Sequence, residues 1–120
     1  MSKQSVQPFD RITRRVYAFE VDGTIVYVGS SSCSLSTLDF NHRNALTKYP
    51  KEADKQTTFR KTLAVDRKLQ QGEFKTMLEI EGITQPEIED LEGQLIRFFN
   101  PKFNKDKDPV RTSRTWGKRY

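Results

Sequence analysis

One carboxylate, Glu92, falls on the apolar face that residues 86–99 would present as a helix. At about 100° per residue, that face collects Ile88, Leu91, Leu95, Ile96, Phe98 and Phe99. A carboxylate removed from water is costly unless a cation or several hydrogen-bond donors meet it. Glu92 therefore indicates either a bound metal ion or a structural ion pair with an arginine.

Two tyrosines on neighbouring predicted strands are the next candidates for chemistry. Tyr17 lies in an alternating stretch over 15–21, and Tyr27 lies in a second β-rich stretch over 24–29. The dipeptide Asp22-Gly23 between the two stretches is a turn signal, so the sequence predicts an antiparallel hairpin.

The register of this hairpin decides whether the two tyrosines can share a site. A two-residue turn at Asp22-Gly23 would place Tyr17 and Tyr27 on opposite faces of the sheet. A three-residue loop that starts at Val21, with Gly23 left-handed in a G1 bulge, would set the tyrosines directly opposite each other. A shared site requires the second register or an equivalent bulge.

The rest of the chain predicts the elements that would position these residues. A serine-rich loop over 30–36 precedes a helix over 38–46, and a second helix runs from 57 or 58 to 71, closed by Gly72. A third strand follows over 74–80, and Thr84 with Glu87 forms a capping box for the helix that carries Glu92. The predicted fold is α/β (α+β): a small antiparallel three-stranded sheet flanked by helices.

Five elements in order resemble the GIY-YIG nuclease family. They are Arg15-Val16-Tyr17, Tyr27-Val28-Gly29, Arg43 on the next helix, Glu92 on a later helix, and Asn100-Pro101-Lys102-Phe103-Asn104. The resemblance covers about residues 15–104. It implies the GIY-YIG fold and a metal-dependent DNA endonuclease that hydrolyses phosphodiester bonds with a single divalent cation.

The resemblance also implies a role for each matching residue. Glu92 would bind Mg²⁺ or Mn²⁺, which oxygen ligands suit. Tyr17 would take a proton from the attacking water, and Tyr27 would orient that water or a phosphate. Arg43 would meet the charge on the phosphoryl oxygens, and Asn104 would support the site.

Some positions depart from the family pattern. Arg15-Val16 replaces the leading Gly-Ile, and Ser30 stands where relatives often carry a lysine. The stretch from Gly29 to Arg43 is long for the family, so the neighbouring His42 could share or assume the role of Arg43.

Charge points to a polyanionic partner. The chain has 21 Lys+Arg against 16 Asp+Glu, a formal net charge of +5. Aromatic and basic side chains alternate in the carboxyl tail, which makes it a candidate DNA contact through Arg111, Arg114, Trp116, Lys118 and Arg119. Backbone N–H groups around Ser30 and Ser31 are a second candidate contact with phosphate. The alternative for the tail is a passive, solvated extension.

These observations predict a leader over 1–14, a nuclease domain over 15–104 and a basic tail over 105–120. No apolar stretch approaches the roughly 20 residues of a membrane span, and no secretion signal precedes the domain, so we expect a cytoplasmic protein. DNA is the expected partner, with a homodimer as one candidate assembly. The alternative functions are an inactive nucleic-acid-binding module of the same fold and a purely structural interaction domain.

Overall fold

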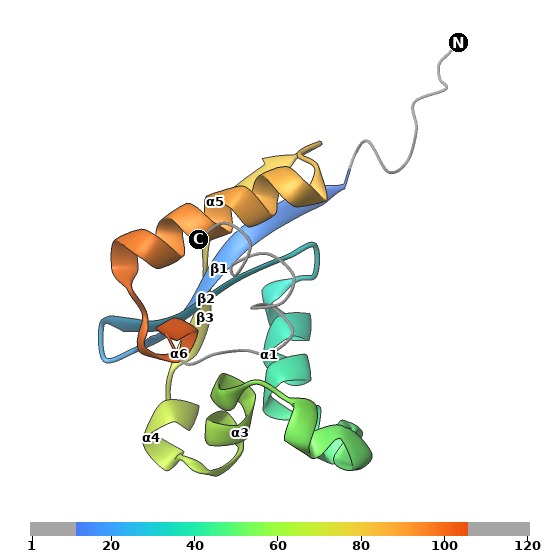
Figure 1. Ribbon diagram of the computed structural model, residues 1–120, viewed down its shortest axis with the longest axis vertical. Helices are drawn as coiled ribbons and strands as arrows, with labels where there is room; N and C mark the ends of the chain where they lie inside the picture. Colours follow the sequence, from blue (N-terminus) through green and yellow to red (C-terminus); the bar gives the residue numbers. More distant parts are fainter. Residues whose placement is uncertain (1–11, 106–120) are drawn as a thin grey trace.

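A three-stranded antiparallel sheet is the centre of the fold, as predicted (Figure 1). The computed structural model describes residues 12–105. The strands are β1 (Thr13–Val21), β2 (Thr24–Ser31) and β3 (Glu73–Glu81), in the order β2-β1-β3. Within this part of the chain, β2 is therefore an edge strand. No strand pairs with its outer edge, so side chains of other elements can hydrogen-bond to its backbone there.

The hairpin between β1 and β2 combines a tight turn with a bulge. Asp22 and Gly23 have φ values of 51° and 78°, as a two-residue type I′ turn requires, and Val21 pairs with Thr24. Of the two alternatives that would allow a shared site, the three-residue loop is therefore absent. The register then shifts between Phe19 and Glu20, where β2 carries one extra residue, and this bulge returns both tyrosines to one face.

Helices cover both faces of the sheet (Figure 1). On one side lie α1 (Leu35–Arg43), α2 (Ala45–Lys48), the 3₁₀ segment η2 (Pro50–Lys55), α3 (Thr58–Val65) and α4 (Arg67–Gln70). On the other side, α5 (Gln85–Phe99) runs along β1 and β2. The short helix α6 (Lys102–Lys105) lies beside β2, and its Phe103 packs 5.7 Å from the ring of Phe59, which belongs to α3 on the first side.

The single helix predicted over 57–71 is two helices. Asp66 has extended backbone angles, φ −94° and ψ 110°, and its carboxylate accepts a hydrogen bond from the N–H of Leu69 at 3.1 Å. An aspartate in this role starts a new helix instead of continuing the old one, so the chain breaks between α3 and α4. The break brings Gln70 and Gly72 close to α1.

Two apolar clusters pack on the two faces of the sheet. The first joins the hairpin to α1, α3 and α4 through Tyr17, Phe19, Tyr27, Leu38, Phe59, Leu63, Leu69 and Phe74. The second joins the hairpin to α5 through Val16, Ala18, Val28 and Ile88. Along β1, odd-numbered side chains point to the first cluster and even-numbered side chains point to the second. Tyr17 on β1 and Tyr27 on β2 both belong to the first cluster, so the sheet separates them from α5.

The predicted capping box at the start of α5 is present. Thr84 accepts from the N–H of Glu87, and the Glu87 carboxylate accepts from the N–H of Thr84. The far end differs from the prediction, because Phe98 and Phe99 are 79% and 38% exposed. Packing of α5 against the sheet ends at Ile96, so the last turn extends beyond the apolar cluster. No helix between residues 12 and 105 is long and apolar enough to cross a membrane.

Candidate active site at the edge of β2

A buried cluster of three rings forms the first half of the candidate site. The Tyr17 hydroxyl lies 3.1 Å from Nε2 of His42, in hydrogen-bond range. The His42 ring centroid is 5.9 Å from the ring centroids of both Tyr17 and Tyr27, and the two tyrosine rings are 6.4 Å apart. Tyr17, Tyr27 and His42 are 4%, 5% and 5% exposed. The bulge in β2 and the inner face of α1 create this cluster.

Phe59 fixes the position of Tyr27 within the cluster. The two rings stack at 4.3 Å between centroids with an interplanar angle of 5°. Phe59 is fully buried at the first turn of α3, whose start is capped by the Thr57 hydroxyl. Stacking of this kind holds the Tyr27 ring in one plane, so the freedom of its hydroxyl is limited by the packing of α3.

A guanidinium meets His42 on the side away from Tyr17. Nε of Arg60 donates to Nδ1 of His42 at 3.1 Å, and the NH1 group of Arg60 donates to Oε1 of Gln56 at 3.0 Å. Burial, and secondly the charge of Arg60, lower the pKa of His42 from 6.5 to about 3. His42 is therefore a neutral imidazole at physiological pH and cannot itself serve as a general acid there.

Gly29 allows the Tyr17 ring to lie across β2. Tyr17 pairs with Gly29 in the hairpin register, and a Cβ atom on Gly29 would come within 2.5 Å of the Tyr17 hydroxyl. Any side chain at this position would displace the ring. The glycine is therefore required by the close approach of Tyr17, which carries its hydroxyl toward the outer edge of the sheet.

Glu92 occupies the opposite face of the sheet, one residue further along β2. The carboxylate is fully buried on α5, and the Ser30 hydroxyl donates to its Oε1 at 2.7 Å. Ser30 pairs with Val16, so its side chain points to the α5 side. A serine hydroxyl thus supports the carboxylate that the sequence singled out.

β2 therefore stands between the tyrosine cluster and Glu92. Tyr17 meets the strand at Gly29 and Glu92 meets it at Ser30, which are consecutive residues. The path through these two residues limits the separation of the Tyr17 hydroxyl and the nearer Glu92 oxygen to about 13 Å. Tyr17 and Glu92 therefore contact consecutive residues of β2 but lie on opposite faces of the sheet.

The Asn104 side chain binds the outer edge of β2 at Val28, the residue before Gly29. Its side-chain oxygen accepts from the N–H of Val28 at 2.8 Å, and its side-chain nitrogen donates to the carbonyl of Val28 at 3.0 Å. This pair of bonds reproduces what an additional strand would supply. Asn104 thereby holds the strand segment that carries Gly29 and Ser30.

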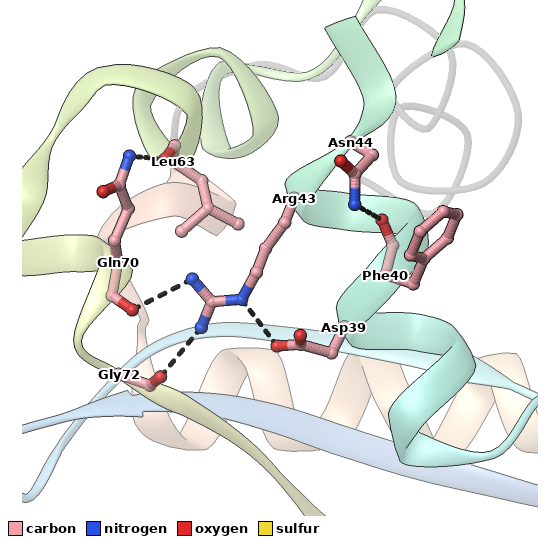
Figure 2. A network of polar contacts seen from close by, with 7 residues as sticks. All are labelled: Asp39, Phe40, Arg43, Asn44, Leu63, Gln70 and Gly72. Atoms are coloured by element: carbon pink, nitrogen blue, oxygen red, sulfur yellow. Dashed lines mark hydrogen bonds and ion pairs between the residues drawn. The ribbon is translucent and has the colours of Figure 1, made fainter. Parts of the chain in front are cut away.

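Arg43 lies outside this group of residues. Its guanidinium donates to the Asp39 carboxylate at 2.7 Å and to the carbonyls of Gln70 and Gly72 at 2.9 and 3.0 Å (Figure 2). Gln70 is the last residue of α4, and Gly72 lies in the connection from α4 to β3, at the opposite edge of the sheet from Asn104. Figure 2 shows the Arg43 guanidinium between α1 and the segment that contains Gln70 and Gly72. These contacts join α1 to that segment, so Arg43 has a structural role.

His42, and not the neighbouring Arg43, lies beside the two tyrosines. One step along a helix rotates a side chain by about 100°, so neighbours on α1 face different surroundings. Arg60, which the sequence did not indicate as a site residue, binds His42, and His42 in turn binds the Tyr17 hydroxyl. The available signal was its position beside Phe59, an inward-facing residue of the same helix.

The other predicted contacts are distributed differently. Ser31 accepts from the N–H of Cys33 at 2.9 Å and so shapes the loop before α1. Ser34 caps α1 by accepting from the N–H of Thr37. The predicted DNA-contacting residues of the tail, Arg111, Arg114, Trp116, Lys118 and Arg119, lie outside the described residues.

The donor atoms around the fully buried Glu92 are oxygens, the type that a hard cation prefers. Between residues 12 and 105, no group of three or more His, Cys, Asp or Glu side chains is placed to bind a metal ion. Glu92 and Ser30 offer oxygen atoms, which Mg²⁺ prefers, and Mg²⁺ often binds through one or two carboxylates, substrate phosphates and water. Glu92 and Ser30 would therefore supply only part of a magnesium site, and substrate and water would supply the remaining ligands.

A scan of protein-family models and searches of curated proteins and solved structures found no match to this chain.

Proposed function

We propose that the chain is a DNA endonuclease that hydrolyses phosphodiester bonds with one divalent cation. The observation that carries the proposal is the buried hydrogen bond between Tyr17 and neutral His42 beside the edge of β2. A tyrosine with a fixed hydrogen-bond partner, next to a strand whose other side carries a buried carboxylate, supports paired acid–base and metal chemistry.

Tyr17 is the proposed base. An ordinary phenol with a pKa near 10 accepts protons poorly at neutral pH only because so little of it is ionised. A hydrogen-bond donor aimed at the phenolic oxygen favours the phenolate over the phenol. The phenolate takes a proton from water, the water oxygen forms a bond to phosphorus, and the bond from phosphorus to the departing sugar oxygen breaks. A proton from solvent completes the departing hydroxyl.

Glu92 is the proposed metal ligand, with Ser30 as its support. When bound there, Mg²⁺ or Mn²⁺ would neutralise charge on the phosphate and on the leaving oxygen. Tyr17 and Glu92 are both buried on opposite sides of β2, so we infer that the phosphodiester approaches along the outer edge of that strand. Asn104 keeps this edge in place, and Tyr27 limits the space beside Tyr17.

Arg43 has no part in this chemistry, because its guanidinium already binds one carboxylate and two carbonyls. This observation also favours the second candidate function, a nucleic-acid-binding module of the same fold without catalysis. In that case the buried Tyr17, His42 and Glu92 would serve stability alone. DNA is the partner in both cases. We propose a cytoplasmic location and treat a homodimer as the assembly to test.

Plasmid cleavage by wild-type protein and Glu92→Gln distinguishes the two functions. Glutamine keeps an oxygen that can accept from Ser30, but it cannot supply a negative charge to a cation. We expect wild-type protein to nick or linearise supercoiled plasmid with magnesium and not with chelator. Glu92→Gln should bind DNA in a gel-shift assay without cleaving it. Binding by both proteins with cleavage by neither would support the inactive module.

A thermal melt of the same variant tests the structural alternative for Glu92. If the carboxylate is mainly one partner of a buried ion pair, its neutralisation should destabilise the fold by about 3–5 kcal/mol. The nuclease proposal expects a much smaller loss, because the contact with Ser30 survives.

A further inference from the structure

Three hydrogen bonds in series connect the start of α3 to the Tyr17 hydroxyl. NH1 of Arg60 donates to Gln56, Nε of Arg60 donates to Nδ1 of His42, and Nε2 of His42 lies 3.1 Å from the Tyr17 hydroxyl. A guanidinium has donors and no acceptor, so the direction of its two bonds is fixed. Nδ1 of His42 must therefore offer its lone pair to Arg60.

We propose that Arg60 is a positioning residue that sets the tautomer of His42 and so sets the hydrogen-bonding role of Tyr17. A neutral imidazole carries one proton, and acceptance at Nδ1 leaves that proton on Nε2. His42 then donates to Tyr17, and the phenolic oxygen is the acceptor. The inference rests on the proposed function for its catalytic consequence, although the tautomer itself is a property of the folded protein.

The opposite tautomer would have the opposite effect on Tyr17. With the proton on Nδ1, Nε2 would accept from the Tyr17 hydroxyl and stabilise the protonated phenol. The pKa of Tyr17 would rise, and a base that must be ionised would be less available. The nitrogen of His42 that carries the single proton therefore decides whether the cluster favours the phenol or the phenolate form of Tyr17.

Packing prevents His42 from escaping this arrangement by turning its ring. The imidazole centroid lies 5.5 Å from the ring of Phe59 and 5.1 Å from the ring of Phe74, in addition to the two tyrosines. These rings come from α3, β3 and the hairpin, so they restrict the plane of the imidazole on several sides. Packing fixes the plane of the ring, and Arg60 decides which nitrogen carries the proton.

Charge reinforces the same preference. Between residues 12 and 105, the titratable or charged side chains in contact with the imidazole are Tyr17, Tyr27 and Arg60. Arg60 is the single cation of this set. It disfavours a second proton on His42 and, at longer range in a buried site, favours negative charge on Tyr17.

The chain contains one histidine, so imidazole ¹⁵N spectra report His42 alone. We expect the wild-type spectrum at pH 7 to show a protonated Nε2 and an unprotonated Nδ1. Arg60→Met removes the donor and should shift the signals toward the Nδ1-protonated form. Arg60→Lys retains a donor and should preserve more of the wild-type pattern. Lys61→Met is the matched control, because it removes an exposed charge from the next position of α3.

Wild-type protein with its proton on Nδ1 would overturn the inference without any variant. An Arg60→Met spectrum identical to wild type in a folded protein would also overturn it. If Arg60→Met fails to fold, the wild-type and Arg60→Lys spectra still decide the point.

The catalytic consequence is measured separately with ¹³Cζ-labelled tyrosine and with cleavage rates. The Tyr17 signal is assigned by its absence from the Tyr17→Phe spectrum. Arg60→Met should raise the pKa of Tyr17 and should move the rise of the cleavage rate with pH to higher pH. Lys61→Met should move neither. A Tyr17 pKa unchanged by Arg60→Met would overturn this consequence. Absence of cleavage by wild-type protein, together with the expected tautomer, would refute the proposed function and leave the hydrogen-bond assignment supported.

Discussion

Burial keeps His42 uncharged, and the folded state loses stability for that reason in acid. The pKa of His42 is lowered from 6.5 to about 3 in the fold, so below pH 6.5 the unfolded chain binds a proton that the native chain does not. The contribution of neutral His42 to the free energy of unfolding is fully present above pH 6.5. As the pH falls from 6.5 toward 3, this contribution decreases by up to about 1.4 kcal/mol per pH unit.

Urea unfolding at pH 7 and pH 5 tests this linkage with His42→Gln. Other groups that titrate in this range remain in both proteins, so the difference between them isolates His42. We expect the wild-type free energy of unfolding to fall between these pH values by about 2 kcal/mol more than that of the variant. Equal losses in the two proteins would show that His42 is not buried in its neutral form.

Arg43 should matter for stability and not for cleavage. Arg43→Ala leaves the carbonyls of Gln70 and Gly72 without their guanidinium donor, which should cost about 1–3 kcal/mol in a urea melt. The ion pair with Asp39 adds little, because both side chains are partly exposed. Arg43→Lys keeps the charge but cannot span both carbonyls. Loss of cleavage by a folded Arg43→Ala protein would contradict this structural role and support a catalytic role for Arg43.

At this scale, sequence and structure agree most closely for Glu92. A helical wheel predicts burial of Glu92 because α5 is regular and its start is well capped. The same reasoning cannot separate His42 from Arg43, because the orientation of α1 depends on contacts with the sheet and with α4. The role of Arg60 is harder still to predict, since it depends on α1 and α3 meeting in space.

The hairpin positions the tyrosines through a combination of turn, bulge and glycine. Gly29→Ala should displace the Tyr17 ring, because the new methyl group would lie within 2.5 Å of its hydroxyl. We expect a loss of about 1–3 kcal/mol in stability and loss of most cleavage activity. Gly23→Asn is the control within the same hairpin, since a Cβ there has no neighbour within 4 Å and asparagine tolerates positive φ. Equal activity in both variants would contradict the arrangement around Tyr17.

Elements are predictable from sequence where a local signal exists. The turn at Asp22-Gly23, the cap at Thr84 and the three strands follow from residue types alone. The bulge in β2 does not, because it is decided by the burial of Tyr27 against Phe59 and not by the turn residues. Asp66 did offer a capping signal, but a continuous apolar pattern over 59–69 favoured one helix over two.

At the scale of the whole molecule, the proposed function requires a surface that binds DNA. Truncation after Lys105 removes two acidic residues, Trp116, Tyr120 and the basic residues Lys107, Arg111, Arg114, Lys118 and Arg119. If the tail contacts DNA, the truncated protein should bind more weakly, and its affinity should fall less steeply with salt. Cleavage at saturating DNA should persist. An unchanged salt slope would assign DNA binding to residues 1–105.

The central claim is that Tyr17 is the base of a nuclease, and Tyr17→Phe tests it most directly. Phenylalanine keeps the ring against Gly29 and Phe74 and removes the hydroxyl bonded to His42. Tyr49→Phe makes the same change on an exposed ring and serves as the control. In magnesium-dependent plasmid cleavage at saturating protein, we predict a loss of about 100-fold or more for Tyr17→Phe and a wild-type rate for Tyr49→Phe. A wild-type cleavage rate in folded Tyr17→Phe would contradict the account.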